Sequence, residues 1–168
     1  MRSPPPSGPG NFARAAIGII ILVLAHFSVR PLLGGRAPVD FLAIAVLFTA
    51  VRVRPGAAAL IGFAAGIIVD ALTPVSFGAG ALAFTLVAYA GSWLKAVFFA
   101  DHVALTGLFV FLGKWLFDAI YLVAGRGPKG ADLLVQLVLW SPIAAAITAL
   151  LAVLLLTLFR PLYRPQSA

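Results

Sequence analysis

The sequence predicts an all-α integral membrane protein, a bundle of about six transmembrane helices joined by short loops. Of the 168 residues, 62% are hydrophobic and 10% are charged, and the mean hydropathy is +1.10. Soluble chains carry about 25% charged residues, so a soluble domain of this length could not cover its surface with so few. The hydrophobic residues also form six long runs, separated by proline, glycine and charged residues. Such runs are typical of helices that cross a bilayer.

The six runs predict six spans, and the segments between them are too short for a soluble domain. The predicted spans are Phe12–Val29, Val39–Val53, Ala57–Leu72, Ala81–Phe99, Val103–Ala124 and Leu133–Phe159. Together they make a transmembrane domain over residues 12–160. The segment 1–11 is rich in proline, serine and glycine and is expected to be a disordered cytoplasmic tail. Residues 161–168 are expected to form a second cytoplasmic tail.

Three of the predicted spans are unusual in their flanking residues or their length. The first run follows Arg2 and Arg14 like a signal peptide, but no small-residue cleavage site follows it, so we expect an uncleaved span. The second run covers roughly 22 Å at ~1.5 Å per residue, short of the ~30 Å hydrocarbon core. A re-entrant hairpin is the alternative there. The sixth run is long enough to predict a tilt, or a kink at Pro142.

The charges predict how the bundle is oriented. Twelve Lys and Arg against five acidic residues, all of them Asp, give a net charge of +7. No basic stripe with interleaved aromatic residues is present, which argues against a nucleic-acid partner. With six spans, seven basic residues fall at inner ends and four in outer loops, so both termini are expected in the cytoplasm. The inner set is Arg2, Arg14, Arg52, Arg54, Lys95, Arg160 and Arg164, and the outer set is Arg30, Arg36, Arg126 and Lys129.

Four of the ionisable residues in the predicted spans stand out, because a charge inside a membrane needs a reason. They are His26, Asp70, Lys114 and Asp118. Lys114 and Asp118 are four residues apart on one helix and therefore share a face. One hypothesis is a polar cluster near the outer side that binds a ligand or a partner's polar residue. The alternative is that these groups reach the headgroups, or that a buried pair fixes the helix register.

Small residues recur at every fourth position of the third span, at Ala58, Gly62 and Gly66. Small side chains let two helix backbones approach closely, which matters in lipid because no hydrophobic force drives helices together there. Two readings remain open: packing within the bundle, and docking of another protein's transmembrane helix.

No catalytic or metal site is predicted. The sequence has no GxSxG, HExxH, P-loop or paired glutamates, and no cysteine. Ser141 lies in the sixth span, but His26 or His102 would have to reach it across the bundle. We therefore expect a protein without enzymatic activity and without a cofactor.

The segment from Arg52 to Leu82 resembles the rod-shape-determining MreD family. The shared features are a short second span near a Pro/Asp pair (Pro38 and Asp40), an Arg/Pro turn, and a Pro/Gly turn before a fourth span with Tyr-x-Gly. The third span carries the family's G-F-x-x-G-x-x-x-D pattern as Gly62, Phe63, Gly66 and Asp70. The acidic residue often found in the fifth span corresponds to Asp118, whereas Lys114 departs from the family pattern.

The resemblance implies a non-enzymatic scaffold of the bacterial cell-elongation machinery, which makes peptidoglycan. Such a protein lies in the cytoplasmic membrane and contacts the single transmembrane helix of MreC. It thereby connects MreB to RodA and penicillin-binding protein 2. The family is also similar in fold to the substrate-binding subunits of energy-coupling-factor transporters. A subunit that binds a vitamin-type small molecule is therefore the alternative function.

Overall fold

The computed structural model describes residues 17–28, 39–72, 76–98 and 103–159, and this part of the chain is helical with short connections. The predicted tails lie outside the described residues. The helices are Ile17–Ser28, α2 (Phe41–Ala50), α3 (Pro55–Leu72), α4 (Ala79–Phe98), α5 (Val103–Ala124), α6 (Ala131–Val135), η2 (Gln136–Trp140) and α7 (Ser141–Phe159). α6, η2 and α7 follow one another without a break, so six helical rods result. The all-helical prediction is confirmed for the described residues.

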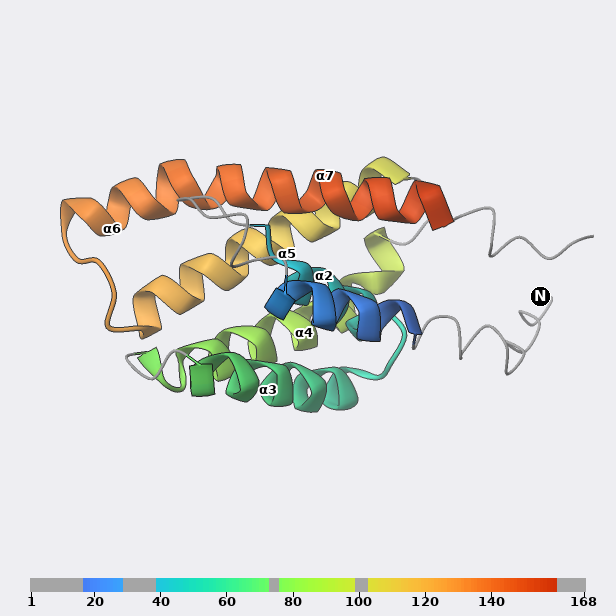
Figure 1. Cartoon of the computed structure of the whole chain (residues 1–168), viewed down its shortest axis with the longest axis horizontal. Coiled ribbons are helices and arrows are strands. Elements are labelled where there is room, and N and C mark those ends of the chain that lie inside the picture. Colours follow the sequence, from blue (N-terminus) through green and yellow to red (C-terminus); the bar gives the residue numbers. More distant parts are fainter. Residues whose placement is uncertain (1–16, 29–38, 73–75, 99–102, 160–168) are drawn as a thin grey trace, which may run out of the picture.

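Three rods are long and apolar enough to cross a membrane: Pro55–Leu72, Val103–Ala124 and Ala131–Leu158. The helices run side by side, with the α6–α7 rod along one side, α3 and α4 along the other, and α2 and α5 between them (Figure 1). The most extensive contact joins α3 to α4, followed by that of α5 with α7.

The short helix α2 forms the centre of the bundle. Its sequence is apolar on every side, as expected for a helix surrounded by others, and seven of its ten residues are buried. At ~1.5 Å per residue it covers roughly 15 Å, about half of the hydrocarbon thickness. A helix that begins inside a bundle leaves its first backbone N–H groups where water is scarce, so protein groups have to satisfy them.

The small-residue stripe of α3 faces α4. Ala58, Gly62, Gly66 and Asp70 are the buried residues of α3. A Cβ atom at Gly62 would overlap the Phe84 backbone, and one at Gly66 would overlap the backbone of Ala81. The stripe is therefore occupied by α4, which favours packing within the bundle over the docking of a partner helix at this face.

The sixth rod, for which the sequence predicts a tilt or a kink at Pro142, contains a π-helical turn directly before this proline. Pro142 lacks an N–H, and its ring would collide with the carbonyl four residues earlier in an α-helix. The chain widens just before it, and the Ser141 N–H bonds to the Gln136 carbonyl, five residues back. The Leu137 carbonyl, which Ser141 would use in an α-helix, instead accepts the indole N–H of Trp115 at 3.2 Å.

Candidate functional site: a buried polar chain beside a cavity

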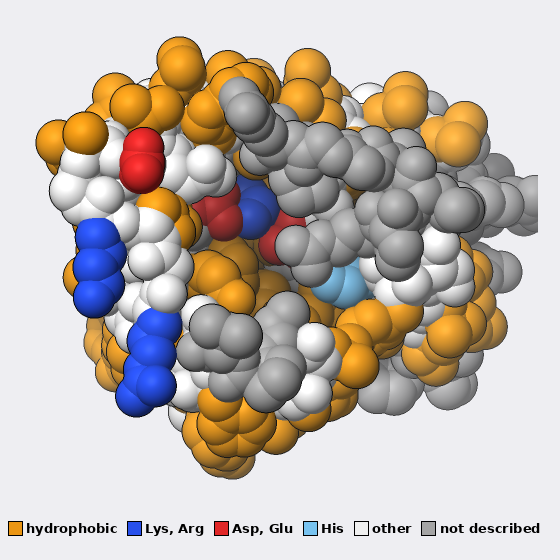
Figure 2. Space-filling view, turned by 60° about the vertical axis from the view of Figure 1, so that its left-hand side comes forward, with side chains coloured by type: hydrophobic (Ala, Val, Ile, Leu, Met, Phe, Trp, Pro, Cys, Tyr) orange, Lys and Arg blue, Asp and Glu red, His pale blue; other side chains and the backbone are white. Residues whose placement is uncertain are grey.

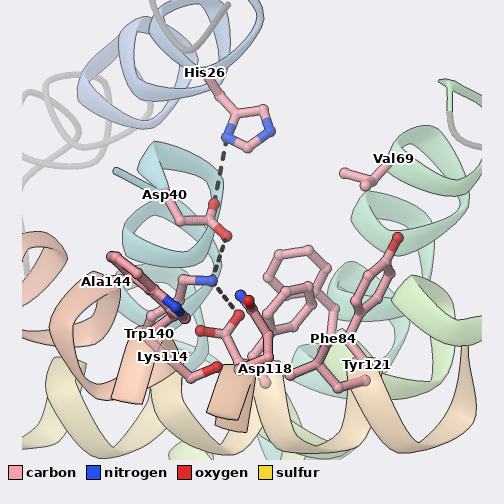
Figure 3. Close-up of a pocket in the computed structure, with 13 residues that line it drawn as sticks. His26, Asp40, Val69, Phe84, Lys114, Asp118, Tyr121, Trp140 and Ala144 are labelled. Carbon is pink, nitrogen blue, oxygen red and sulfur yellow. Dashed lines mark hydrogen bonds and ion pairs between the residues drawn. The ribbon is translucent and has the colours of Figure 1, made fainter. Parts of the chain in front are cut away.

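A chain of four ionisable side chains lies in the middle of the bundle. It comprises His26 from the helix Ile17–Ser28, Asp40 at the start of α2, and Lys114 and Asp118 from α5 (Figure 3). Lys114 Nζ lies 3.2 Å from Asp40 Oδ2 and also contacts Asp118 Oδ1. His26 Nδ1 lies 3.3 Å from Asp40 Oδ1. Asp40 therefore joins the histidine to the lysine.

Asp40 takes this position because it caps α2. Its Oδ1 accepts the N–H of Ala43 at 3.0 Å, the usual arrangement of an N-cap side chain. The N–H of Asp40 itself donates to Thr148 Oγ1 on α7 at 3.2 Å. At the start of α2, the N–H of Ala43 is thus bonded to the Asp40 side chain, and the N–H of Asp40 is bonded to a hydroxyl from α7.

His26 completes the same cap from a neighbouring helix. Its Nδ1 accepts the N–H of Leu42 at 3.2 Å, which requires an unprotonated Nδ1. A protonated Nδ1 would instead donate to Asp40. The Nδ1 atom therefore either accepts the N–H of Leu42 or donates to Asp40, depending on which ring nitrogen carries the proton.

Lys114 balances the charge of this cap. Its side chain is 7% exposed and lies between two carboxylates, with its ammonium 4.9 Å from the centre of the Phe117 ring. A buried ammonium is tolerated only when it is paired and hydrogen-bonded. The (i, i+4) spacing brings Asp118 to it, as the sequence predicted, and the fold adds Asp40.

Asp70 has a different neighbourhood. It is fully buried, and its carboxylate accepts three backbone N–H groups at 2.9 Å, from Gly78, Gly80 and Ala81. These groups belong to the start of α4, where Gly78 has a φ of +96° and offers no side chain as a cap. Asp70 thus caps α4 from α3. Of the four predicted polar residues, the structure joins His26, Lys114 and Asp118 through Asp40, and places Asp70 at this second cap.

A cavity of about 190 Å³ adjoins the polar chain. Figure 2 shows it as a hollow, with acidic, basic and histidine side chains inside, when the left-hand end of Figure 1 comes forward. Aromatic and polar residues from α4, α5, η2 and α7 complete it. Its lining residues are His26, Asp40, Val69, Phe84, Lys114, Phe117, Asp118, Tyr121, Leu122, Gln136, Trp140, Ser141 and Ala144.

The π-helical turn contributes Gln136 and Trp140 to this lining. Turns of this kind are frequent at functional sites because they re-aim side chains. Sequence reasoning missed this contribution and the role of Asp40. The Asp40 signal was present, since an aspartate directly before an apolar run is an N-cap pattern.

The described residues offer no group of three His, Cys, Asp or Glu side chains that could hold a metal ion. Comparisons of the chain with protein-family models, curated proteins and solved structures found no match.

Proposed function

We propose that this protein is a non-enzymatic scaffold subunit of the bacterial cell-elongation machinery, located in the cytoplasmic membrane with both termini in the cytoplasm. The observation that carries the proposal is the role of the residues that resemble the MreD family. Gly62 and Gly66 allow α4 to lie against α3, and Asp70 caps α4 at the turn that follows. These residues thus hold α3 and α4 together as one helical hairpin. The spacing of the pattern is explained by these contacts and not by hydrophobicity alone.

The proposed partner is the single transmembrane helix of an MreC-type protein. Helices associate in lipid through close packing and a few polar contacts, and the described helices expose large apolar side chains such as Leu60, Val138 and Leu150. Because α4 occupies the stripe Ala58–Gly62–Gly66, the partner is expected on another face of the bundle. Through this partner the protein would act indirectly on MreB, RodA and penicillin-binding protein 2.

Co-purification tests the proposal. The tagged protein and the MreC-type protein of the same organism are co-expressed and extracted in a mild detergent. Capture of the partner is expected, and it should be lost when the partner's transmembrane segment is exchanged for an unrelated one. Equal recovery of the partner on an unrelated multi-pass protein would contradict the proposal.

The cavity raises a second candidate function, a small-molecule-binding subunit of a membrane transporter. Pockets for drug-sized ligands usually measure about 300–1,000 Å³, and this cavity is smaller at about 190 Å³. A vitamin-sized ligand therefore fits it poorly. Mass spectrometry of the purified protein discriminates the two functions, because a metabolite bound in stoichiometric amount would favour the second.

A further inference from the structure

We infer that the exposed face of α4 is the surface on which the partner's transmembrane helix docks, with a hydrogen-bonding side chain of that helix opposite the Tyr89 hydroxyl. The inference rests on the proposed function for the identity of the partner. It goes beyond that function by naming the face and the chemistry of the partner. Three features of α4 carry it: its row of exposed side chains, the depth of Tyr89, and the state of the Tyr89 hydroxyl.

The exposed side of α4 carries a narrow row of four large side chains, which we call the α4 stripe. Its members, Leu82, Leu86, Tyr89 and Trp93, are between 46% and 66% exposed. Their spacing of four, three and four residues places them on one side of the helix, and at ~1.5 Å per residue they extend over roughly 16 Å. The other sides of α4 pack against α3, α5 and α2. The α4 stripe therefore faces away from the bundle and has the width and length of a contact with one helix.

Tyr89 lies near the middle of α4. It is ten residues after Ala79, where the helix starts, and nine before Phe98, where it ends. At ~1.5 Å per residue its Cα atom is therefore roughly 15 Å and 14 Å from the two ends. A tyrosine side chain on a helix leans toward the N-terminal end, which keeps the hydroxyl in the central part of this helix. In the proposed six-span arrangement a hydroxyl at that depth finds no water to bond to.

The Tyr89 hydroxyl forms no hydrogen bond with any residue that the structure describes. The hydroxyls of the half-buried Thr85 and the exposed Thr157 instead bond to carbonyls of their own helices, at 2.6 and 2.9 Å. They can do so because a hydroxyl on Cβ lies close to its own backbone. The Tyr89 hydroxyl stands at the far end of a rigid ring and cannot reach the carbonyls of its own turn. Since an unbonded hydroxyl in hydrocarbon is unfavourable, its partner has to come from another molecule.

A transmembrane helix with a polar residue in its middle fits the α4 stripe. Helices in lipid associate through side-chain packing and through hydrogen bonds of Ser, Thr, Asn and Gln side chains. Leu82 and Leu86 offer apolar contacts on one side of Tyr89, and Trp93 offers a large aromatic surface on the other. The partner's transmembrane segment is therefore expected to carry Ser, Thr, Asn or Gln in its middle third. A segment without any hydrogen-bonding side chain there would overturn the inference.

Photo-crosslinking identifies what covers the α4 stripe. Benzoylphenylalanine is placed at Leu86 or, as the matched control, at Leu150 of α7, which is 71% exposed and belongs to the opposite side of the bundle (Figure 1). Each variant is co-expressed with the MreC-type protein. Irradiation is expected to join position 86 to the partner, and position 150 to the partner only weakly. Cross-linking of position 86 to a second copy of this chain, or to neither protein, would overturn the inference.

Tyr89→Phe removes only the hydroxyl. It is expected to lower the capture of the partner about fivefold, the usual contribution of one hydrogen bond. The melting temperature of the protein alone should stay unchanged, because no described residue bonds to this hydroxyl. Thr157→Val, which removes a surface hydroxyl from α7, is the control and should capture the partner fully. Undiminished capture by Tyr89→Phe, or a lowered melting temperature of this variant, would contradict the role of the hydroxyl.

A change in the partner completes the test. Replacing the polar residue in the middle of its transmembrane segment by leucine should lower capture as much as Tyr89→Phe does, and the two changes together should cause no further loss. Losses that multiply would show that the two groups do not meet. Capture that persists with cross-links only from position 150 would reject the α4 stripe and leave the scaffold proposal in place. Failure of all capture would reject the scaffold proposal and the docking face together.

Discussion

At the scale of single residues, two buried aspartates have the same role, which is to accept backbone N–H groups at the start of a helix. Asp40 accepts a backbone N–H at the start of α2, and Asp70 accepts three at the start of α4. The first N–H groups of a helix have no partner within the helix, and in a bilayer no water replaces one. A carboxylate at each buried helix start solves this problem and also suits the positive end of the helix dipole.

Asp70→Ala is therefore expected to destabilise the protein by at least about 2 kcal/mol, because the N–H groups of Gly80 and Ala81 are buried, and each buried N–H group left without an acceptor costs about 1–3 kcal/mol. Asp70→Asn should lose less, since one oxygen remains as an acceptor. Thermal unfolding of the purified protein in detergent measures the loss, with the exposed Asp132→Ala as control. A melting temperature of Asp70→Ala equal to that of the control would disprove the cap.

Lys114→Met should destabilise the protein by about 3–5 kcal/mol, because it leaves two buried carboxylates without their cation. Adding Asp118→Asn to the same chain should recover part of this loss, since one of the two carboxylates that faced the ammonium is then uncharged. The same melting assay measures both variants, and Lys129→Met on the exposed loop is the control. Losses that simply add would show that the two side chains do not interact in the native state.

The sequence was informative about these residues only in part. The scarcity of charges inside apolar runs marked His26, Lys114 and Asp118, and the spacing of the last two predicted their contact, which the structure shows. It did not connect Asp40 with them, because that contact depends on how α2 lies between its neighbours. The partners of Asp70 follow from the geometry of the turn before α4, which periodicity does not encode.

At the scale of helices, close backbone contact and one widened turn determine the packing. The glycines of α3 bring it against α4, while the exposed side of α3 carries large apolar residues such as Leu60 and Phe63, which are 72% and 50% exposed. A surface of this kind suits lipid.

Gly62→Leu is expected to separate α3 from α4 and to destabilise the protein by about 1–3 kcal/mol or more, since overpacking forces backbones apart. Gly56→Leu on the same helix is the matched control, because a Cβ at Gly56 meets nothing within 4 Å. Thermal melts of both variants distinguish the internal stripe from an external one. A loss of partner capture by Gly62→Leu without any loss of stability would instead place the stripe on the outside.

The π-helical turn makes a prediction of its own. Trp115→Phe should cost about 0.5–1.5 kcal/mol, because the Leu137 carbonyl loses its donor. In a Pro142→Ala background the Ser141 N–H is free to bond to Leu137 as in an α-helix, so the same substitution should cost less. A double-mutant cycle of the melting free energies measures this difference. An unchanged cost in the Pro142→Ala background would contradict the link between the proline and the turn.

The bounds of the helices were easier to predict from the sequence than the contacts between them. The predicted run Val103–Ala124 has the same bounds as α5, and the third and sixth spans differ from the helices by two residues at one end. The second span was predicted as Val39–Val53, whereas α2 ends at Ala50 because the chain turns before Pro55. The sequence predicted a tilt or a kink at Pro142, but it did not predict the widened turn before this proline, because the bond of that turn to Trp115 depends on a neighbouring helix.

At the scale of the whole molecule, polarity is reversed relative to a soluble protein. Apolar side chains such as Leu150, which is 71% exposed, cover the outside, while the ionisable chain His26–Asp40–Lys114–Asp118 lies inside. Lipid tolerates such an exterior, and the bundle interior supplies the partners that buried charges need. This distribution of side chains therefore suits helices that cross a membrane.

Single-cysteine labelling in intact cells tests this crossing most directly, because the chain has no cysteine of its own. α3, α4 and α5 lie between Arg54 and Lys129, and the segments that carry these residues lie at opposite ends of the bundle (Figure 1). A membrane-impermeant thiol reagent is predicted to label Lys129→Cys in intact cells and Arg54→Cys only after permeabilisation. Labelling of both positions from the same side would contradict the membrane-spanning arrangement.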